Sequence, residues 1–375
     1  MKLELNSQAR AKNTLHPLTG TTKSQAYTFT KIAETNGFFI QFSYIASINN
    51  RGVVAFQAAA LLKGGREAIF TGDGRAIAKI ADTGNFFKGF TSPSINDAGV
   101  VAFLASLKTG GKGIFTANSR DLTQIADTKS RFCWFSGTPS INNASNVAFW
   151  AALEDGGEGI FTGNGSDLTK IADTKDYFSA VASPSINDQG NVAFRATGEQ
   201  GSYGIFKGNG ERILKIANTS NSFSWFAHPC INNVGSVTFL AYPTQGGYGI
   251  FQRNGGKITN IAHTSGCFSQ FAAPSLNDSG AIAFRANLNG TDEGIFIATG
   301  STAKKVIAVG DYLFGSKVTS LVFSPGGLNN AGQMAFFARL ANGTSGIFRA
   351  DPVISATPKT REREFFGRRS LIANC

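Results

Sequence analysis

The stretch Ser94-Ile95-Asn96-Asp97-Ala98-Gly99-Val100-Val101-Ala102-Phe103 decides the fold, because its pattern returns along the 375-residue chain at nearly constant intervals. Successive copies of the motif are 47, 46, 45, 45, 45 and 52 residues apart. An internal period of roughly 20 to 50 residues is typical of an array of similar structural units. The Ile or Leu of the motif lies at Ile48, Ile95, Ile141, Ile186, Ile231, Leu276 and Leu328.

Two further motifs share this period, and each occurs seven times. The motif Gly-Ile-Phe, which reads Ala-Ile-Phe in its first copy, ends at Phe70, Phe115, Phe161, Phe206, Phe251, Phe296 and Phe348. The motif Lys-Ile-Ala-Asp-Thr, in its fullest form, has its Ile at Ile32, Ile80, Ile125, Ile171, Ile216, Ile261 and Ile307.

Each unit predicts four short β-strands. In residues 175–219 these are Phe178–Ile186, Asn191–Ala196, Gly204–Lys207 and Ile213–Ala217. They are rich in Phe, Val and Ile and are bounded by Gly, Asn, Asp or Ser, and no segment keeps the apolar spacing of a helix. Seven such units predict an all-β fold, a seven-bladed β-propeller with four-stranded blades.

The order of the motifs predicts how the ring closes. The first recognisable element is a fourth strand, 27–35, and the last is a third strand, 346–350. Strand 27–35 can therefore pair with strand 346–350 and remove both open sheet edges. The competing architecture, an open β-solenoid, would instead need a capping unit at each end.

The repeats resemble a known family. Asn-x-x-Gly-x-x-Ala-Phe, as in Asn96 to Phe103, resembles the NxxGxxAF tandem-repeat proteins of bacteria, largely cyanobacteria, over residues 27–350. Pro184 to Gly190 also resembles the turn of TolB-type, WD40-like propeller repeats. The resemblance implies a propeller fold and no defined activity. Ser145 departs from it by replacing Gly, and the export and anchoring signals frequent in that family are not visible, so the compartment stays open.

The net charge of +11 does not predict nucleic-acid binding. Residues 1–26 contribute +3 and residues 351–375 contribute +2, which leaves +6 spread singly over the 324 residues between them. No run of Lys and Arg is present that would follow a phosphate backbone. The sequence also shows no apolar core of a signal peptide. It has no apolar stretch of about 18 residues, the length that a membrane span needs.

These features predict three parts of the chain. We expect a flexible N-terminal extension at 1–26, the propeller at 27–350 and a basic C-terminal tail at 351–375. We expect a monomer without a cofactor and with reduced cysteines, because Cys133, Cys230, Cys267 and Cys375 are too few and too irregularly spaced for a disulfide scaffold.

Two repeated polar positions are interpreted as structural. The Asn of the Ser-Ile-Asn motif precedes a turn, where its side chain can bond to the backbone that follows in an Asx turn; the other interpretation is a ring of ligands. The residue after Ile-Ala, which is Asp82, Asp127 or Asp173 in three copies, fits the capping of a turn, and in later copies it is Asn218 or His263.

One local cluster departs from the repeat. His228, Cys230, His263 and Cys267 occupy positions that hold Ser, Ala or Asp in other units. Two His and two Cys could bind Zn²⁺ tetrahedrally, but their spacing matches no compact zinc motif. We therefore predict no metal site, and we single out no catalytic residues.

The most variable segments lead into the first strand of each unit, and we expect them at one rim of the channel. Aromatic and polar side chains there suit a sugar or an extended polymer. The alternative is that the two Trp residues fill space between blades. The candidate ligand-binding residues are Gln41, Lys88, Trp134, Trp225 and Gln270.

The sequence thus favours a non-enzymatic binding or scaffolding module for a carbohydrate or a protein partner at this rim. The alternative is an enzyme, a hydrolase, a lyase or a group-transfer enzyme, with its active site in the channel or at the rim. Three or more acidic, Tyr or Arg side chains converging in one pocket would favour the enzyme. A bland channel with a marked groove at the rim would favour the binding module.

Overall fold

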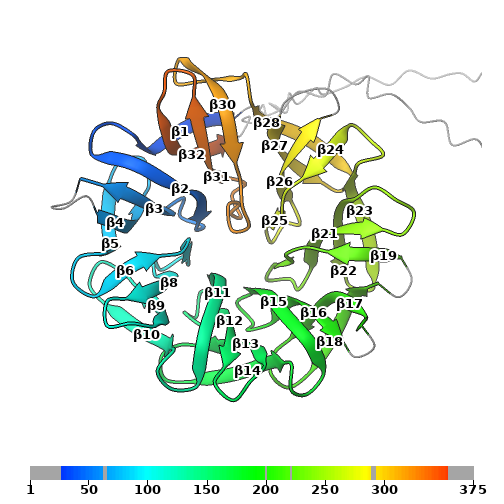
Figure 1. Ribbon diagram of the computed structural model, residues 1–375. Coiled ribbons are helices and arrows are strands. Elements are labelled where there is room, and N and C mark those ends of the chain that lie inside the picture. The colour runs from blue at the N-terminus through cyan, green and yellow to red at the C-terminus, as the bar shows by residue number, and fades with distance from the viewer. Residues whose placement is uncertain (1–26, 62–65, 199–200, 220–221, 289–292, 354–375) are drawn as a thin grey trace, which may run out of the picture.

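A computed structural model describes residues 27–61, 66–198, 201–219, 222–288 and 293–353. The predicted N-terminal extension and, apart from its first three residues, the predicted basic tail lie outside the described residues. Those that are described form strands and turns without an α-helix, and they contain no helix that could cross a membrane. Seven antiparallel sheets stand side by side in a ring, which confirms the predicted seven-bladed propeller (Figure 1).

The strands of the first four blades follow the predicted order. Blade 1 holds β2 (Phe39–Ile48), β3 (Val54–Ala60), β4 (Arg66–Gly72) and β5 (Ile77–Asp82). Blade 2 holds β6 (Phe87–Phe90), β7 (Ser94–Ile95), β8 (Val101–Leu107), β9 (Lys112–Ala117) and β10 (Leu122–Asp127). Blade 3 holds β11 (Phe132–Ile141), β12 (Val147–Leu153), β13 (Glu158–Gly163) and β14 (Leu168–Asp173). Blade 4 holds β15 (Phe178–Ile186), β16 (Val192–Gly198), β17 (Tyr203–Gly208) and β18 (Ile213–Asn218).

The last three blades complete the ring. Blade 5 holds β19 (Phe223–Phe226), β20 (Cys230–Ile231), β21 (Val237–Pro243), β22 (Gly249–Asn254) and β23 (Lys257–His263). Blade 6 holds β24 (Phe268–Phe271), β25 (Ser275–Leu276), β26 (Ile282–Leu288), β27 (Glu293–Thr299) and β28 (Thr302–Ala308). Blade 7 holds β29 (Tyr312–Leu313), β30 (Ser316–Val322), β31 (Met334–Leu340), β32 (Ser345–Pro352) and the N-terminal strand β1 (Tyr27–Glu34).

Proline divides the first strand of three blades. Pro93, Pro229 and Pro274 fall between the two short pieces of that strand in blades 2, 5 and 6. Proline has no N–H to donate to the sheet, so pairing stops there and resumes beyond it. In blades 3 and 4 the corresponding Pro139 and Pro184 coincide with a shift in register.

Stacked Phe residues form the centre of every blade. Phe103, which ends the Asn-x-x-Gly-x-x-Ala-Phe motif, lies opposite Phe115 of the Gly-Ile-Phe motif, with ring centres 6.0 Å apart and planes at 22°. Both rings are buried. The two motifs are therefore cross-strand partners, and the pair recurs as Phe56–Phe70, Phe149–Phe161, Phe194–Phe206, Phe239–Phe251, Phe284–Phe296 and Phe336–Phe348.

The Ile of the Lys-Ile-Ala motif marks a β-bulge in the outer strand. In blade 5, for example, His263 and Ala262 pair with Gly249 and Ile250, and the ladder then skips Ile261. In blade 6 the skipped residue is Val306. The prediction of Ile307 at this position is therefore wrong by one residue: Ile307-Ala308 matches the Ile-Ala of the motif, but the residue that the ladder skips is Val306.

The ring closes as predicted. Strand β1 pairs with β32 in an antiparallel ladder that runs from Tyr27 opposite Pro352 to Glu34 opposite Gly346. The two strands come from opposite ends of the described chain, so the last blade is built from both ends (Figure 1).

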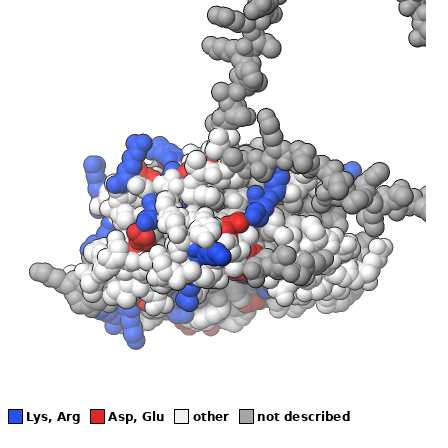
Figure 2. Space-filling view, turned by 90° about the horizontal axis from the view of Figure 1, so that it is seen from above, with Lys and Arg blue, Asp and Glu red and all other residues white. Residues whose placement is uncertain are grey.

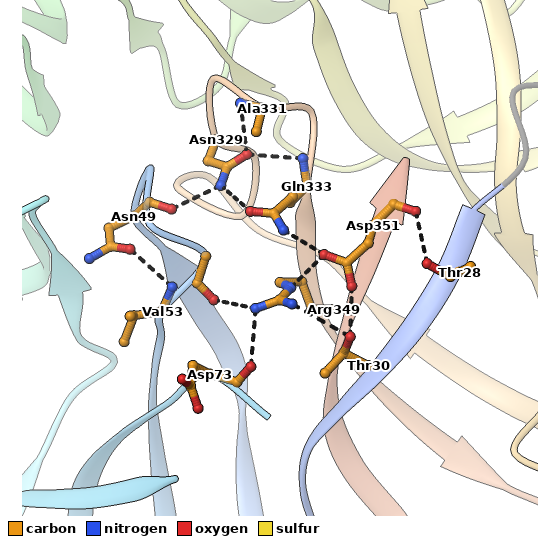
Figure 3. Close-up of polar contacts among 11 residues, drawn as sticks. Thr28, Thr30, Asn49, Val53, Asp73, Asn329, Ala331, Gln333, Arg349 and Asp351 are labelled. Atoms are coloured by element: carbon orange, nitrogen blue, oxygen red, sulfur yellow. Dashed lines mark hydrogen bonds and ion pairs between the residues drawn. The ribbon is translucent and has the colours of Figure 1, made fainter. Parts of the chain in front are cut away.

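A polar network stabilises the seam, which is the junction where β1 pairs with β32 (Figure 3). Arg349 Nε donates to Asp351 Oδ1 over 2.7 Å, and Thr30 Oγ1 of β1 donates to the other carboxylate oxygen over 2.7 Å. Arg349 Nη1 also donates to the carbonyl oxygens of Gly52 and Asp73 in blade 1. One guanidinium group thus links the two chain ends to each other and to the next blade.

A closed ring of asparagine hydrogen bonds links all seven blades near the axis. The Nδ2 of each Asn in the Ser-Ile-Asn motif donates to the backbone carbonyl of the corresponding Asn in the next blade, over 2.9 to 3.2 Å. Asn329 donates to Asn49 and so completes the circle. The members are Asn49, Asn96, Asn142, Asn187, Asn232, Asn277 and Asn329, and all are buried.

The same asparagines form the predicted Asx turns. The Oδ1 of each accepts the backbone N–H four residues later, as Asn49 Oδ1 does from Val53 over 3.0 Å. The turn requires a positive φ at the motif's Gly. Ser145, which replaces that Gly in blade 3, adopts a φ of 62°, and its hydroxyl accepts a hydrogen bond from Asn96 Nδ2 over 3.2 Å.

A second ring lies one residue further along. Asp and Asn alternate around it, so that each carboxylate is flanked by amides, and each accepts three hydrogen bonds from its neighbours. Seven is an odd number, so two amides, Asn330 and Asn50, meet between blades 7 and 1. The members are Asn50, Asp97, Asn143, Asp188, Asn233, Asp278 and Asn330.

Ring closure can be tested by truncation. Deleting residues 1–35 removes β1 and leaves β32 as an unpaired edge, so the melting temperature should fall by at least about 10 °C and aggregation should increase. Deleting residues 1–26 leaves β1 in place and serves as the control. Equal melting temperatures for the two proteins would contradict closure by β1.

The asparagine ring can be tested in blade 4. Asn187→Ala removes the bonds to the part-buried Asn191 N–H and to the buried Asn232 carbonyl and leaves both groups without these partners, so it should cost about 2 to 3 kcal/mol of unfolding free energy. Asn209→Ala is the matched control, because Asn209 caps the turn between β17 and β18 without reaching another blade; it should cost less than about 1 kcal/mol. Similar losses on urea denaturation would argue against the linking role.

Candidate functional site

A funnel of about 520 Å³ opens on the axis of the ring. All seven blades contribute to its lining, six of them with residues at the end of the first strand and blade 7 with residues that follow β30, and these segments are rich in Ser and Pro. A ring of apolar side chains, among them Ile48, Ile95 and Leu328, closes its narrow end. Beyond this ring lies a smaller cavity of about 160 Å³, lined by the Asn and Asp rings. The channel is therefore divided into an open funnel and a narrow polar end.

Four side chains give the funnel its chemical character. Trp150 and Arg195 come from the second strands of blades 3 and 4, whereas in blade 5 His228 lies between β19 and β20 and Cys230 begins β20. Burial lowers the pKa of His228, and the positive charge of Arg195 adds to this effect. Burial also raises the pKa of the Cys230 thiol, which opposes thiolate formation. No Asp or Glu of the described chain lines the funnel.

The five candidate ligand-binding residues are all exposed, and none lines the funnel. The structure brings two of them together. Lys88 and Trp134 line one groove of about 570 Å³ between blades 2 and 3. In blades 1, 5 and 6 the position that Trp134 holds in blade 3 is occupied by Gln41, Trp225 and Gln270, and these three residues do not line the groove. Their ligand-binding role stays a prediction.

The groove contains residues that the sequence analysis did not select. Lys112 begins β9, Thr128 follows β10, and Cys133 precedes Trp134 in β11. The Lys112 ammonium lies 6.0 Å from the centre of the Trp134 ring, a cation–π contact. Lys112 lies where five of the other six units carry Glu or Tyr, as at Glu158 and Tyr203, and blade 7 carries Ser345; this departure from the repeat was the available signal.

A missing bridge explains why the groove opens at this junction. Elsewhere a polar side chain links one blade to the first strand of the next, as when Glu158 accepts the Val181 N–H over 3.1 Å or Tyr203 donates to the Phe226 carbonyl over 3.0 Å. Among the described residues, Lys112 makes no such bond. Gly89 also occupies in blade 2 the position that Trp134 holds in blade 3, and it adds no side chain.

The two candidate Trp residues are packed on one side and open on the other. Trp134 is 41% exposed and meets Trp150 edge-on, with ring centres 5.4 Å apart. Trp225 is 39% exposed and meets Tyr242 in the same way, also at 5.4 Å. Each ring therefore contributes to packing and still presents aromatic surface to solvent.

The His and Cys cluster does not assemble. His228 and Cys230 line the funnel, whereas His263 ends the outer strand β23 and Cys267 lies in the turn after it. His263 Nδ1 accepts the Ser265 N–H over 3.0 Å, which is the capping bond that Asp82 makes to Gly84 in blade 1. The described residues contain no group of three or more His, Cys, Asp or Glu that could hold a metal ion.

Positive charge is scattered on the face of the molecule seen in Figure 2. On the face shown in Figure 2, Lys and Arg side chains stand singly or in small groups on a largely uncharged surface. The pattern on this face agrees with the absence of a basic run in the sequence.

The chain matches the model of a known family. The model described as "Family of unknown function (DUF7453)" matches residues 17–211 and 128–352, which together cover most of the chain. No curated protein sequence matches the chain.

Solved structures share the fold at low sequence identity. The β-propeller domain of the trilobed protease from Pyrococcus furiosus, which has an open velcro topology, is 10% identical with a TM-score of 0.60 and covers 84% of this chain and 96% of its own. Oligogalacturonate lyase from Vibrio parahaemolyticus is 12% identical with a TM-score of 0.57 and covers 87% and 97%. A chain of the mitotic checkpoint complex is 13% identical with a TM-score of 0.50 and covers 92% and 100%. These neighbours include enzymes and a protein assembly, so the fold does not decide the function.

The placement of the cysteines can be tested by alkylation of the native protein. Cys133 and Cys267 are exposed, whereas Cys230 is buried with a raised pKa. Iodoacetamide should modify the first two rapidly and Cys230 only after denaturation, as followed by peptide mass spectrometry. Equal rates for Cys230 and Cys267 in the native protein would contradict the buried position of Cys230.

Proposed function

This chain belongs to the family of unknown function DUF7453, and we propose that it is a non-enzymatic binding module that holds an acidic saccharide in the groove between blades 2 and 3. The observation that carries the proposal is the meeting of Lys88, Lys112 and Trp134 in one open groove. Two ammonium groups and one aromatic face are the groups that a sugar acid would engage.

The chemistry of each group supports this ligand class. The exposed surface of Trp134 can stack on the apolar face of a sugar ring. Neither Lys88 nor Lys112 forms an ion pair with a described residue, so both ammonium groups can donate hydrogen bonds to a carboxylate or a sulfate of a ligand. The hydroxyl and backbone groups of Ser106 and Thr128 line the same groove and add hydrogen-bonding capacity.

One carboxylate, that of Glu67, approaches the groove from its blade 1 side. A side chain on Gly89 would meet Glu67 Oε2 at 3.9 Å, and this carboxylate already accepts a hydrogen bond from Gln57 over 3.3 Å. No Asp or Glu of the described chain lines the groove itself. The groove therefore favours an anion over a cation.

A binding role is favoured over catalysis by what the groove and the funnel contain. The narrow polar cavity does bring together three carboxylates, those of Asp97, Asp188 and Asp278, but each of them already accepts three hydrogen bonds from the neighbouring amides. The groove holds no acidic, Tyr or Arg side chain, and the funnel holds Arg195 as its one member of that set within the described chain. Cys230, the funnel's strongest potential nucleophile, has a raised pKa and is buried. The oligogalacturonate lyase shares the fold at 12% identity, a likeness that carries neither its activity nor its substrate to this chain.

The groove is tested by mutation at its aromatic face. Trp134→Ala should weaken binding of an oligouronate probe about tenfold in isothermal titration, because the stacking surface is lost. Trp225→Ala is the matched control: its ring has the same position in its blade, a similar exposure and a similar edge-on neighbour, but lies outside the groove. The two variants should lose similar stability, and only Trp134→Ala should lose affinity.

The charge requirement is tested with a second probe. The same oligosaccharide with its carboxyl groups reduced to alcohols should bind several-fold more weakly, and Lys88→Gln with Lys112→Gln should abolish the difference. Bound ligand should also slow alkylation of Cys133, which lines the groove, and leave Cys267 unaffected. Equal binding of the two probes, or an equal loss of affinity in the two Trp variants, would overturn the proposal.

A further inference from the structure

The funnel contains an arginine whose counterpart two blades away is paired. Arg195 in β16 lies opposite Ile205, and Arg285 in β26 lies opposite Ile295, so the two hold the same position in blades 4 and 6. Arg285 forms an ion pair with Glu293 at 2.5 Å, and its Nη1 also donates to the Leu321 carbonyl. Blade 6 thus shows how the positive charge of an arginine at this position is neutralised when the residue has a structural role alone.

In blade 4 the neutralising carboxylate is replaced. Tyr203 stands where Glu293 stands in blade 6, and its ring lies 5.6 Å from the Arg195 guanidinium carbon. The Tyr203 hydroxyl is engaged with the Phe226 carbonyl. Arg195 forms no ion pair with a described residue, is only partly buried, and lines the funnel. Its planar group therefore keeps its hydrogen-bonding capacity.

The walls around Arg195 determine what could occupy the space. His228 is close enough for its pKa to be lowered by the charge of Arg195, and it offers a second nitrogen donor. Trp150, Pro139, Pro184 and the ring of Ile side chains supply apolar surface. A cavity of about 520 Å³ with mostly apolar walls and a few convergent polar groups has the character of a small-molecule site.

We propose that the funnel is a second binding site, separate from the groove, for a small organic acid that places its carboxylate on the Arg195 guanidinium and its apolar body against Trp150. Arginine recognises a carboxylate through two parallel hydrogen bonds, a geometry that a lysine does not reproduce. The absence of acidic side chains from the described lining leaves the carboxylate without a repelling neighbour.

The test compares an aromatic acid with its neutral isostere. Naphthoate should bind the full-length protein at least about tenfold more tightly than naphthamide in isothermal titration, with saturation transfer from the protein to the naphthyl protons. Arg195→Gln should remove this preference and leave the weaker binding of naphthamide unchanged. Lys88→Gln, in the groove, should change neither, which separates this site from the one proposed above.

A second variant guards against a folding defect in Arg195→Gln. Tyr203→Glu recreates the arrangement of blade 6. There the Glu293 carboxylate forms an ion pair with Arg285 and accepts the backbone N–H of Leu321 in the next blade. In blade 4 the new carboxylate would pair with Arg195 and accept the N–H of Phe226. The variant should retain the melting temperature and lose the preference for naphthoate. Equal affinities for the two probes in the wild type, no binding of naphthoate, or a preference that survives in Tyr203→Glu would overturn the proposal.

Discussion

The hydrogen bond from one asparagine amide to the carbonyl of the next blade is the interaction on which the ring depends. Blades pack through apolar faces, and such packing is not directional. The asparagine bond adds direction, because Nδ2 of one blade must meet a carbonyl that the next blade's own Asx turn has placed. Since the seven bonds form a closed circle, a displaced blade strains two of them. The Phe pairs, the bulges and the seam are arranged around this constraint.

The fold could be predicted from the sequence because its determinants are local and repeated. The Asn-x-x-Gly turn, the Phe of each motif and the surplus strand at 27–35 each predict an element without knowledge of its neighbours, and the structure contains all of them. Contacts between blades were beyond that reasoning. The Asx turn of Asn187 was foreseen, whereas its bond to Asn232 was not, because the partner lies 45 residues away and depends on the angle between blades.

The candidate sites show the same division. Lys88 and Trp134 were selected from the variable segments expected at the channel rim, but nothing in the sequence indicated that these two would share a groove while Trp225 would not. The groove exists because Lys112 fails to bridge to blade 3 and Gly89 adds no side chain. Arg195 was overlooked because one arginine in a strand is unremarkable alone. It becomes informative only when Arg285 supplies the paired state for comparison.

Because the blades repeat, each position can be compared with its counterparts, and the two binding sites that we propose lie where a structural pairing of the repeat is lost. The groove opens where Lys112 makes no bridge to the next blade, and the unpaired arginine of the funnel lies where Tyr203 replaces the carboxylate that Glu293 supplies in blade 6. The groove and the funnel are also neighbours: Trp134 lines the groove, Trp150 lines the funnel, and the two rings touch edge-on at 5.4 Å. Trp150 is in turn held by Glu158, which accepts its Nε1–H over 3.1 Å and the Val181 N–H of the next blade. One aromatic pair thus forms part of the wall of both cavities, and its position is fixed by the same kind of bridge between blades that the groove itself lacks.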